Sequence, residues 1–378
     1  MRSATKALSA LALLLTMTAC DDPNKADMDN ATRNQKKSDL GELLYNAKSL
    51  SGNGQMSCAT CHDTDHAMID SRVDTNSIGA SESTDGNKLG DRNAPTAAYA
   101  MFSPRFHFDS GEGLYIGGQF LDGREPDLQG QAKGPFLNPA EMQMEDEAAV
   151  VAVVEANTTL NPQLRTIYGD DIFNDTMKAY NAIAESIALF EISPIFAPFD
   201  SKYDHYLAGT ATLSALEQEG LRLFSAKAMC TACHPAIAEE GSHPLFTDHS
   251  FDNLGVPANA MLHAARAANN QENPIDLGLG KTVNDTSLNG TFRVSTLRNI
   301  AVTGPYMHNG VFKDLKTVVH FYNTRDVEGA TDLDGNPWEA SEVPETVNHA
   351  ELGDLGLSDH EEDAIVAFLE TLTDKKFK

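Results

Sequence analysis

Two copies of one five-residue pattern each place two thiols and an imidazole within a short stretch of chain. The first is Cys58-Ala59-Thr60-Cys61-His62 and the second is Cys230-Thr231-Ala232-Cys233-His234. C-x-x-C-H is the attachment signal of a c-type haem, in which both sulfurs bond the porphyrin and the histidine ligates the iron. We therefore predict two haem c groups, with Cys58, Cys61 and His62 holding the first and Cys230, Cys233 and His234 holding the second.

A single copy of this pattern would leave two other interpretations open. It could form a thioredoxin-like dithiol or half of a zinc site. The two copies use four of the five cysteines in the chain, and a histidine follows each one directly. This regularity favours haem over the dithiol and over zinc.

Residues 1–19 are expected to be an export signal rather than part of the fold. They combine Arg2 and Lys6 with an apolar run that is too short for a lasting transmembrane helix. The small residues before Cys20 resemble a bacterial lipobox, which would make Cys20 a lipid attachment site. Cleavage nearby by the ordinary signal peptidase is the alternative. Asp21 resembles an inner-membrane retention signal, so we expect a periplasmic lipoprotein that touches the inner membrane only through its lipid.

The charge balance limits the classes of partner. Lys and Arg total 28 and Asp and Glu total 55, which gives a net charge of −27. A surface of this sign repels nucleic acid and anionic lipid. It favours a basic partner protein, or it serves solubility alone.

Helical patterns dominate the rest of the chain, and strand signals are weak. Residues 20–38 are polar and are predicted to form a flexible tether. We expect helices near 39–50, 148–156, 174–191 and 314–323, with loops over 63–91, 258–293 and 332–357. In the helix near 174–191, one face carries Met177, Tyr180, Ala184, Ile187 and Phe190.

Two capping boxes mark further helix starts, Ser214 with Glu217 and Ser358 with Glu361. The first helix should run through Phe224 to deliver Cys230. The second should form an amphipathic closing helix that carries Ile365, Phe368, Leu369 and Leu372. Pro194 and Pro198 break the helical pattern, so we predict an all-α protein with domains at 39–198 and 199–378.

Several longer stretches match one protein family in order and spacing. They are RNAPT at 92–96, FLDGREPDLQGQAKGPFLNPAEM at 120–142, STLRNIAVTGPYMHNGVFKDL at 295–315 and DAIVAFLETLT at 363–373. With the two haem patterns, they make the chain resemble the bacterial di-haem cytochrome c peroxidases and their relative MauG. The resemblance implies two cytochrome-c-like domains with a peroxidatic first haem, an electron-accepting second haem and an interdomain Ca²⁺.

By position in the family motif, Gln131, Pro135 and Glu141 would line the distal pocket of the first haem. Cleavage of a peroxide O–O bond needs a base that moves a proton from one oxygen to the other, and a carboxylate with an amide neighbour suits that task. Taken alone, Glu141 could be an ordinary acid at a helix start.

The resemblance also implies a calcium site. It would be formed by Asn93 and the backbone carbonyls of Thr303 and Pro305, which are hard oxygen ligands of the kind that Ca²⁺ prefers. Without the family, Asn93 would be interpreted as a turn residue.

Three positions depart from the usual peroxidase pattern. Ala80 stands where many members have a histidine that caps the first iron, and His66 is expected to be a solvent-facing loop residue. Tyr322 stands where some of the peroxidases have a methionine that ligates the second iron, and in MauG a tyrosine ligates that iron. In this chain Met307 or His320 are the alternative ligands. Leu121 replaces a tryptophan that lies between the haems, and leucine cannot relay electrons.

These observations predict an exported di-haem peroxidase that reduces H₂O₂ with electrons from a small c-type cytochrome or cupredoxin. One alternative is a MauG-like oxidase that modifies aromatic residues of a partner protein. Another is a di-haem electron carrier without catalytic turnover.

Overall fold

The computed structural model describes residues 23–73, 78–237 and 242–378. The expected signal segment and Cys20 lie outside these residues. Within them, no helix combines the length and the apolar character needed to cross a membrane.

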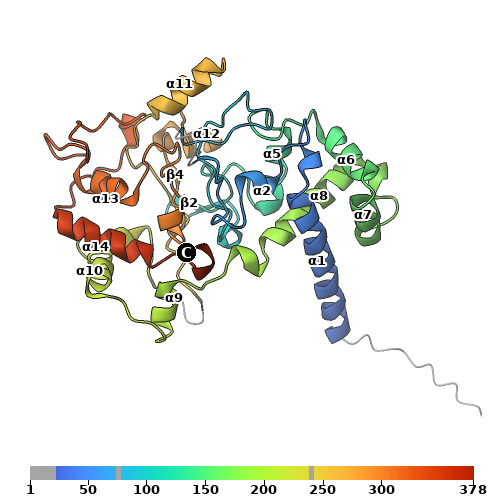
Figure 1. Cartoon of the computed structure of the whole chain (residues 1–378), viewed down its shortest axis with the longest axis horizontal. Coiled ribbons are helices and arrows are strands. Elements are labelled where there is room, and N and C mark those ends of the chain that lie inside the picture. The colour runs from blue at the N-terminus through green and yellow to red at the C-terminus, as the bar shows by residue number, and fades with distance from the viewer. Residues whose placement is uncertain (1–22, 74–77, 238–241) are drawn as a thin grey trace, which may run out of the picture.

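The described part of the chain is rich in helices (Figure 1). The helices are α1 (Pro23–Tyr45), α2 (Cys58–Cys61), α4 (Leu128–Gln131), α5 (Gly134–Leu137), α6 (Glu147–Ala156), α7 (Leu160–Tyr168), α8 (Thr176–Glu191), α9 (Lys202–Leu207), α10 (Ala215–Ser225), α11 (Ala260–Ala268), α12 (Leu279–Val283), α13 (Leu315–Thr324) and α14 (Asp359–Glu370). Two small antiparallel sheets, which the sequence did not predict, pair β1 (His107–Asp109) with β2 (Leu114–Ile116) and β3 (Phe251–Asp252) with β4 (Phe292–Arg293). Phe108 lies opposite Tyr115, and Phe251 lies opposite Arg293.

Two pairs of crossed helices form the centres of two hydrophobic cores. α1 packs on α8, and α10 packs on α14, on opposite sides of the molecule (Figure 1). The first core runs from Leu40 to Phe196 and the second from Tyr203 to Leu372. These cores lie on either side of the predicted boundary at residue 198, while the division into domains stays a prediction.

The two helix pairs cross in the same way, at a glycine. A Cβ on Gly41 would lie 1.9 Å from the carbonyl oxygen of Ser186, and one on Gly220 would lie 1.8 Å from that of Ala364. The backbones therefore touch at both crossings, and no larger side chain fits there. This shared geometry supports an internal duplication that is barely visible in the sequence outside the haem patterns.

Most predicted helices are present, with two differences: one helix begins earlier than predicted, and another buries a different set of side chains. The helix expected from residue 39 begins at Pro23, so residues 23–38 are helical rather than a flexible tether. Proline suits a first helical turn, residues 24–38 contain no glycine, and the packed end near Leu40 and Leu44 supports the helix. Met177 is 50% exposed and does not share the buried face of α8.

Both capping boxes are confirmed at the starts of α10 and α14. The region 258–293, expected to be mostly loop, contains α11 and α12. α11 begins where the Asn259 side chain accepts a hydrogen bond from the Leu262 amide, and Leu262 is buried. The apolar face of α11 is short and an Asn-rich sequence follows it, so the sequence showed no clear helical period there.

We predict that Gly41→Ala and Gly220→Ala each destabilise the haem-loaded protein by about 1–3 kcal/mol or more, because overpacking forces the helices apart. Thermal melting measures the effect. The matched control is Gly111→Ala in an exposed loop, where the nearest atom to the added Cβ is the flexible Asp109 carboxylate at 3.1 Å. Unchanged melting of both helix variants would contradict the close crossing.

Candidate functional site

The first C-x-x-C-H pattern forms the short helix α2 and the residue that follows it. Ser57 caps α2 in a capping box with Thr60, and His62 ends it. The His62 Nδ1 atom lies 3.2 Å from the carbonyl oxygen of Met68. A carbonyl can only accept, so Nδ1 carries the hydrogen and Nε2 keeps its lone pair. Burial lowers the pKa of His62 and keeps the ring neutral, as an iron ligand must be.

The second pattern repeats this arrangement. His234 Nδ1 lies 2.7 Å from the carbonyl oxygen of Phe246, and burial again lowers the pKa of the imidazole. Cys230 and Cys233 form no disulfide, and burial raises the pKa of both thiols to about 12. Uncharged thiols beside a neutral imidazole fit an apolar macrocycle held from one side.

The distal residues predicted for the first site come from α4, α5 and the turn that follows. Gln131 ends α4 and Pro135 lies in the first turn of α5. The Met142 amide donates to the Pro135 carbonyl at 3.2 Å, which brings Pro135 beside the turn that carries Glu141. No hydrogen bond joins Gln131 to Glu141 among the described residues.

The Glu141 carboxylate interacts electrostatically with the thiols of the first pattern. Burial raises the pKa of Cys58 and Cys61, and the negative charge of Glu141 adds to the effect on both. Burial also raises the pKa of Glu141 itself to about 7, against the opposing charge of Arg124 and a hydrogen bond from Asn138 Nδ2 to Oε1 at 2.8 Å. A carboxyl that titrates near neutral pH can both take and give a proton.

A cavity of about 330 Å³ adjoins the second pattern. Cys230, Cys233 and His234 line it together with Tyr322 and Met307. The Tyr322 hydroxyl lies 3.9 Å from the Met307 sulfur, so both predicted ligands of the second iron reach the same space. Burial raises the pKa of Tyr322 well above its usual value, so only a bound cation would hold it as phenolate.

His320, the other alternative ligand, is engaged elsewhere. Its Nδ1 lies 2.8 Å from Glu362 Oε1, and its Nε2 lies 3.0 Å from the Thr331 carbonyl oxygen. Both ring nitrogens are engaged by these partners, and His320 is not among the described residues that line the cavity beside His234.

Arg293 is a residue of this cavity that the sequence analysis missed. It lines the cavity, and among the described residues its guanidinium donates to neutral groups, Ser103 Oγ at 3.1 Å and the Phe120 carbonyl at 3.4 Å, and forms no ion pair with a carboxylate. Burial lowers the pKa of its guanidinium to about 10. An unpaired buried cation fits a cofactor that carries carboxylates, as haem does. The only local signal was an arginine placed between two apolar residues, Phe292 and Val294.

The predicted calcium residues lie together at the edge of the same cavity. Asn93 Nδ2 donates to the Pro305 carbonyl at 2.6 Å, and Thr303 also lines this space. Among the described residues, no cluster of three or more His, Cys, Asp or Glu side chains could hold a metal. An ion here would therefore depend on amide and carbonyl oxygens and water, and calcium stays a prediction.

The departures from the peroxidase pattern also have structural positions. Ala80 is fully buried and packs with Leu89 and Leu262. His66 is an exposed loop residue paired with Asp63 at 2.7 Å, as expected. Leu121 is buried and lines the cavity beside the second haem pattern.

Comparison with known proteins identifies the family of the chain. A family model described as di-haem cytochrome c peroxidase matches residues 35–212. MauG from Paracoccus denitrificans is 40% identical over 350 residues, which cover 90% of this chain and 89% of that protein. The chain belongs to the di-haem cytochrome c peroxidase and MauG family.

Other members are similar under both names. The cytochrome c551 peroxidase of Nitrosomonas europaea is 30% identical over 302 residues, covering 80% of this chain and 77% of that protein. The crystal structure of the diheme peroxidase BthA from Burkholderia thailandensis matches with a TM-score of 0.81 and 31% identity, covering 90% of this chain and 86% of that one. Membership of this di-haem family fits the two C-x-x-C-H patterns of the chain. It does not decide between the peroxidase reaction and the MauG reaction, because relatives carry both names.

We predict that protein matured in a cytochrome-c-competent host gains the mass of two haems, because each site offers two thiols and a neutral imidazole. Intact mass spectrometry measures this. A control with Cys230→Ser and Cys233→Ser should gain one haem. A wild-type mass with one haem or none would contradict the prediction.

Proposed function

We propose that this protein binds two haem c groups and reduces H₂O₂ to water at the first of them. The observation that carries the proposal is the half-buried Glu141 side chain, which interacts electrostatically with Cys58 and Cys61 and whose pKa is raised to about 7 by desolvation. A simple electron carrier needs no such group. The distal position of Glu141 therefore favours catalysis over electron transport alone.

A haem held by Cys58, Cys61 and His62 would supply the iron that binds peroxide and accepts its oxidising equivalents. Glu141 would take a proton from one oxygen of the peroxide and return it to the other, which would leave as water. The hydrogen bond from Asn138 holds the carboxylate in place for both transfers. Overall, one H₂O₂, two electrons and two protons give two waters.

The proposal includes the rest of the family arrangement. The second haem site, at His234, would pass in electrons from a small c-type cytochrome or cupredoxin, and the net charge of −27 suits a donor with a basic face. Gln131 and Pro135 would shape the peroxide site. Calcium at Asn93, Thr303 and Pro305, and a periplasmic location with a lipid on Cys20, complete the proposal.

We predict that Glu141→Gln keeps both haems but slows the reaction with H₂O₂ by roughly two to four orders of magnitude, the usual size of a lost acid–base contribution. The wild-type rate should fall as the pH drops through about 7, because a protonated Glu141 cannot accept a proton. Stopped-flow spectroscopy of the Soret band measures both effects.

Glu145→Gln is the matched control, since Glu145 is exposed and four residues away. It should leave the rate and its pH dependence unchanged. If Glu141→Gln reacts at the wild-type rate, Glu141 is not the proton carrier.

A MauG-like oxidation of a partner protein is the second candidate function. Tyr322 favours it, because this tyrosine reaches the second cavity beside Met307. A tyrosinate on iron is a hard anionic ligand that lowers the reduction potential, whereas a methionine raises it. A low potential would let the second site store an oxidising equivalent instead of only delivering electrons.

We predict that Tyr322→Phe raises the reduction potential of the second haem, because the anionic ligand is lost. Met307→Leu should change it little. Potentiometric titration measures both variants, with Tyr306→Phe as a control that lines the same cavity and donates to the Ile300 carbonyl. The reverse result, a lost low-spin ferrous spectrum in Met307→Leu alone, would assign methionine as the ligand.

A further inference from the structure

Tyr99 is a buried tyrosine shared by the two halves of the molecule. Its ring packs in the first hydrophobic core, is 2% exposed, and lines the cavity of the second haem site. The chain just before it holds the first site: Ala97 N–H donates to the Met68 carbonyl at 3.1 Å, the same carbonyl that faces His62 Nδ1. Tyr99 therefore lies between the two haem sites.

The phenol of Tyr99 has a proton acceptor in contact. Its hydroxyl donates to Asp374 Oδ2 at 2.7 Å, and Asp374 is fully buried. Asn299 Nδ2 donates to the same oxygen at 2.9 Å, and the Asp200 amide donates to Oδ1 at 2.8 Å. These bonds fix the carboxylate so that it can take the phenolic proton without moving.

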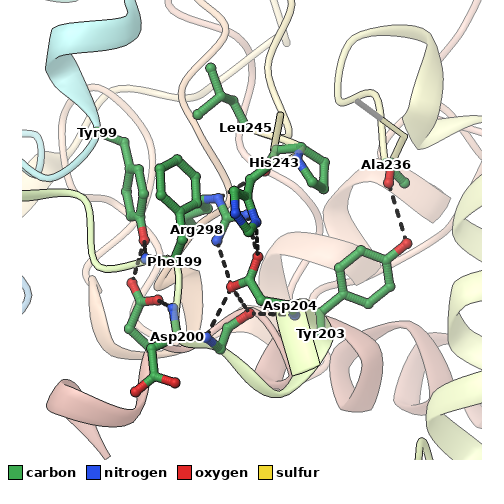
Figure 2. A network of polar contacts seen from close by, with 12 residues as sticks. Tyr99, Phe199, Asp200, Tyr203, Asp204, Ala236, His243, Leu245 and Arg298 are labelled. Atoms are coloured by element: carbon green, nitrogen blue, oxygen red, sulfur yellow. Dashed lines mark hydrogen bonds and ion pairs between the residues drawn. The ribbon is translucent and has the colours of Figure 1, made fainter. Parts of the chain in front are cut away.

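A buried cation lies over the same ring. The Arg298 guanidinium lies 5.0 Å from the Tyr99 ring centroid and 4.5 Å from that of Phe199, and it pairs with Asp204 at 2.8 Å (Figure 2). The positive charge of Arg298 disfavours a second positive charge on the Tyr99 ring, which would form if the tyrosine lost an electron and kept its proton. Burial raises the pKa of Tyr99 above its usual value, so the phenol is protonated at rest. An electron can therefore leave Tyr99 only together with its proton.

The other two tyrosines that line the cavity beside the second haem pattern have different hydroxyl partners. Tyr306 donates to the Ile300 carbonyl, and Tyr322 contacts the Met307 sulfur, neither of which is a base that takes a proton. Leu121 lines the cavity without any accessible redox state. Tyr99 combines a place between the sites with a carboxylate partner.

We propose that Tyr99 is a redox-active residue that carries an oxidising equivalent between the two haem sites. The proposal rests on the peroxide reaction proposed above. Tyr99 loses one electron to a haem site oxidised by H₂O₂ and loses its phenolic proton to Asp374 Oδ2, which leaves a neutral phenoxyl radical. An electron arriving from the donor protein reduces the radical, and the proton returns from Asp374.

The test is freeze-quench EPR of the haem-loaded full chain mixed with H₂O₂. Wild-type protein should give a tyrosyl signal that narrows when ring-deuterated tyrosine is incorporated. Tyr99→Phe should lose most of that signal, while the first Soret change with peroxide keeps its wild-type rate. Tyr180→Phe is the matched control: Tyr180 is equally buried, but its hydroxyl donates to the Lys133 carbonyl at 2.7 Å. It should keep the signal.

Asp374→Asn provides a second variant, because it keeps the Tyr99 ring and removes the base. It should also lose the tyrosyl signal, with haem content and melting checked separately. A signal that persists unchanged in Tyr99→Phe, or a wild-type protein that reacts with peroxide and forms no tyrosyl radical, overturns the role of Tyr99 alone. A wild-type Soret band that does not respond to peroxide overturns the proposed function as well.

Discussion

Each haem-site histidine is oriented by one hydrogen bond to a backbone carbonyl, and much of the fold serves to aim that carbonyl. Met68 and Phe246, which present the two carbonyls, both have positive φ angles, 58° and 53°. A non-glycine residue in this region costs about 1–3 kcal/mol and persists only where its surroundings impose it. The two sites therefore depend on neighbours that hold each turn in place.

Matching threonines supply that restraint. Thr96 Oγ1 donates to the Ala67 carbonyl, and Thr296 Oγ1 donates to the Leu245 carbonyl, both at 2.6 Å. Three residues after each threonine stands a residue with left-handed backbone, Tyr99 in one half and Asn299 in the other, each with φ of 63°. The duplicated scaffold thus brings Tyr99 and Asn299 to equivalent places, where both donate to Asp374.

The sequence predicted the parts of this design that short-range chemistry determines. The C-x-x-C-H patterns identified the thiols and imidazoles, and the capping boxes at Ser214 and Ser358 located helix starts, because each depends on residues within four positions. The contact of Tyr99 with Asp374 spans 275 residues and had no local signal. Arg293 was missed for the same reason, since its isolation from acids becomes visible only in the folded cavity.

Burial is the common origin of the chemistry proposed at both sites. It raises the pKa of Glu141 into the range where a proton moves both ways, and it keeps Tyr99 protonated beside its acceptor. At the cavity beside the second haem pattern, burial also lowers the pKa of the Arg293 guanidinium, which forms no ion pair with an acid among the described residues. In water these groups would be an ionised acid, a free phenol and a solvated cation with no special reactivity.

The same burial bears on the choice between the two enzyme functions. A peroxidase must pass oxidising equivalents quickly to an electron donor, whereas an oxidase of a partner protein must hold them until the partner is reached. A tyrosine whose hydroxyl oxygen lies 2.7 Å from a buried carboxylate oxygen can pass its proton there and take it back, which would keep its radical neutral and reversible. Because Leu121 has no accessible redox state, the proposed role of Tyr99 would make the lifetime of the oxidised state depend on Tyr99 and on the ligand of the second iron. Under the role proposed for Tyr99, the interior between the haem sites would bear on the choice between the two candidate reactions as much as the peroxide pocket does.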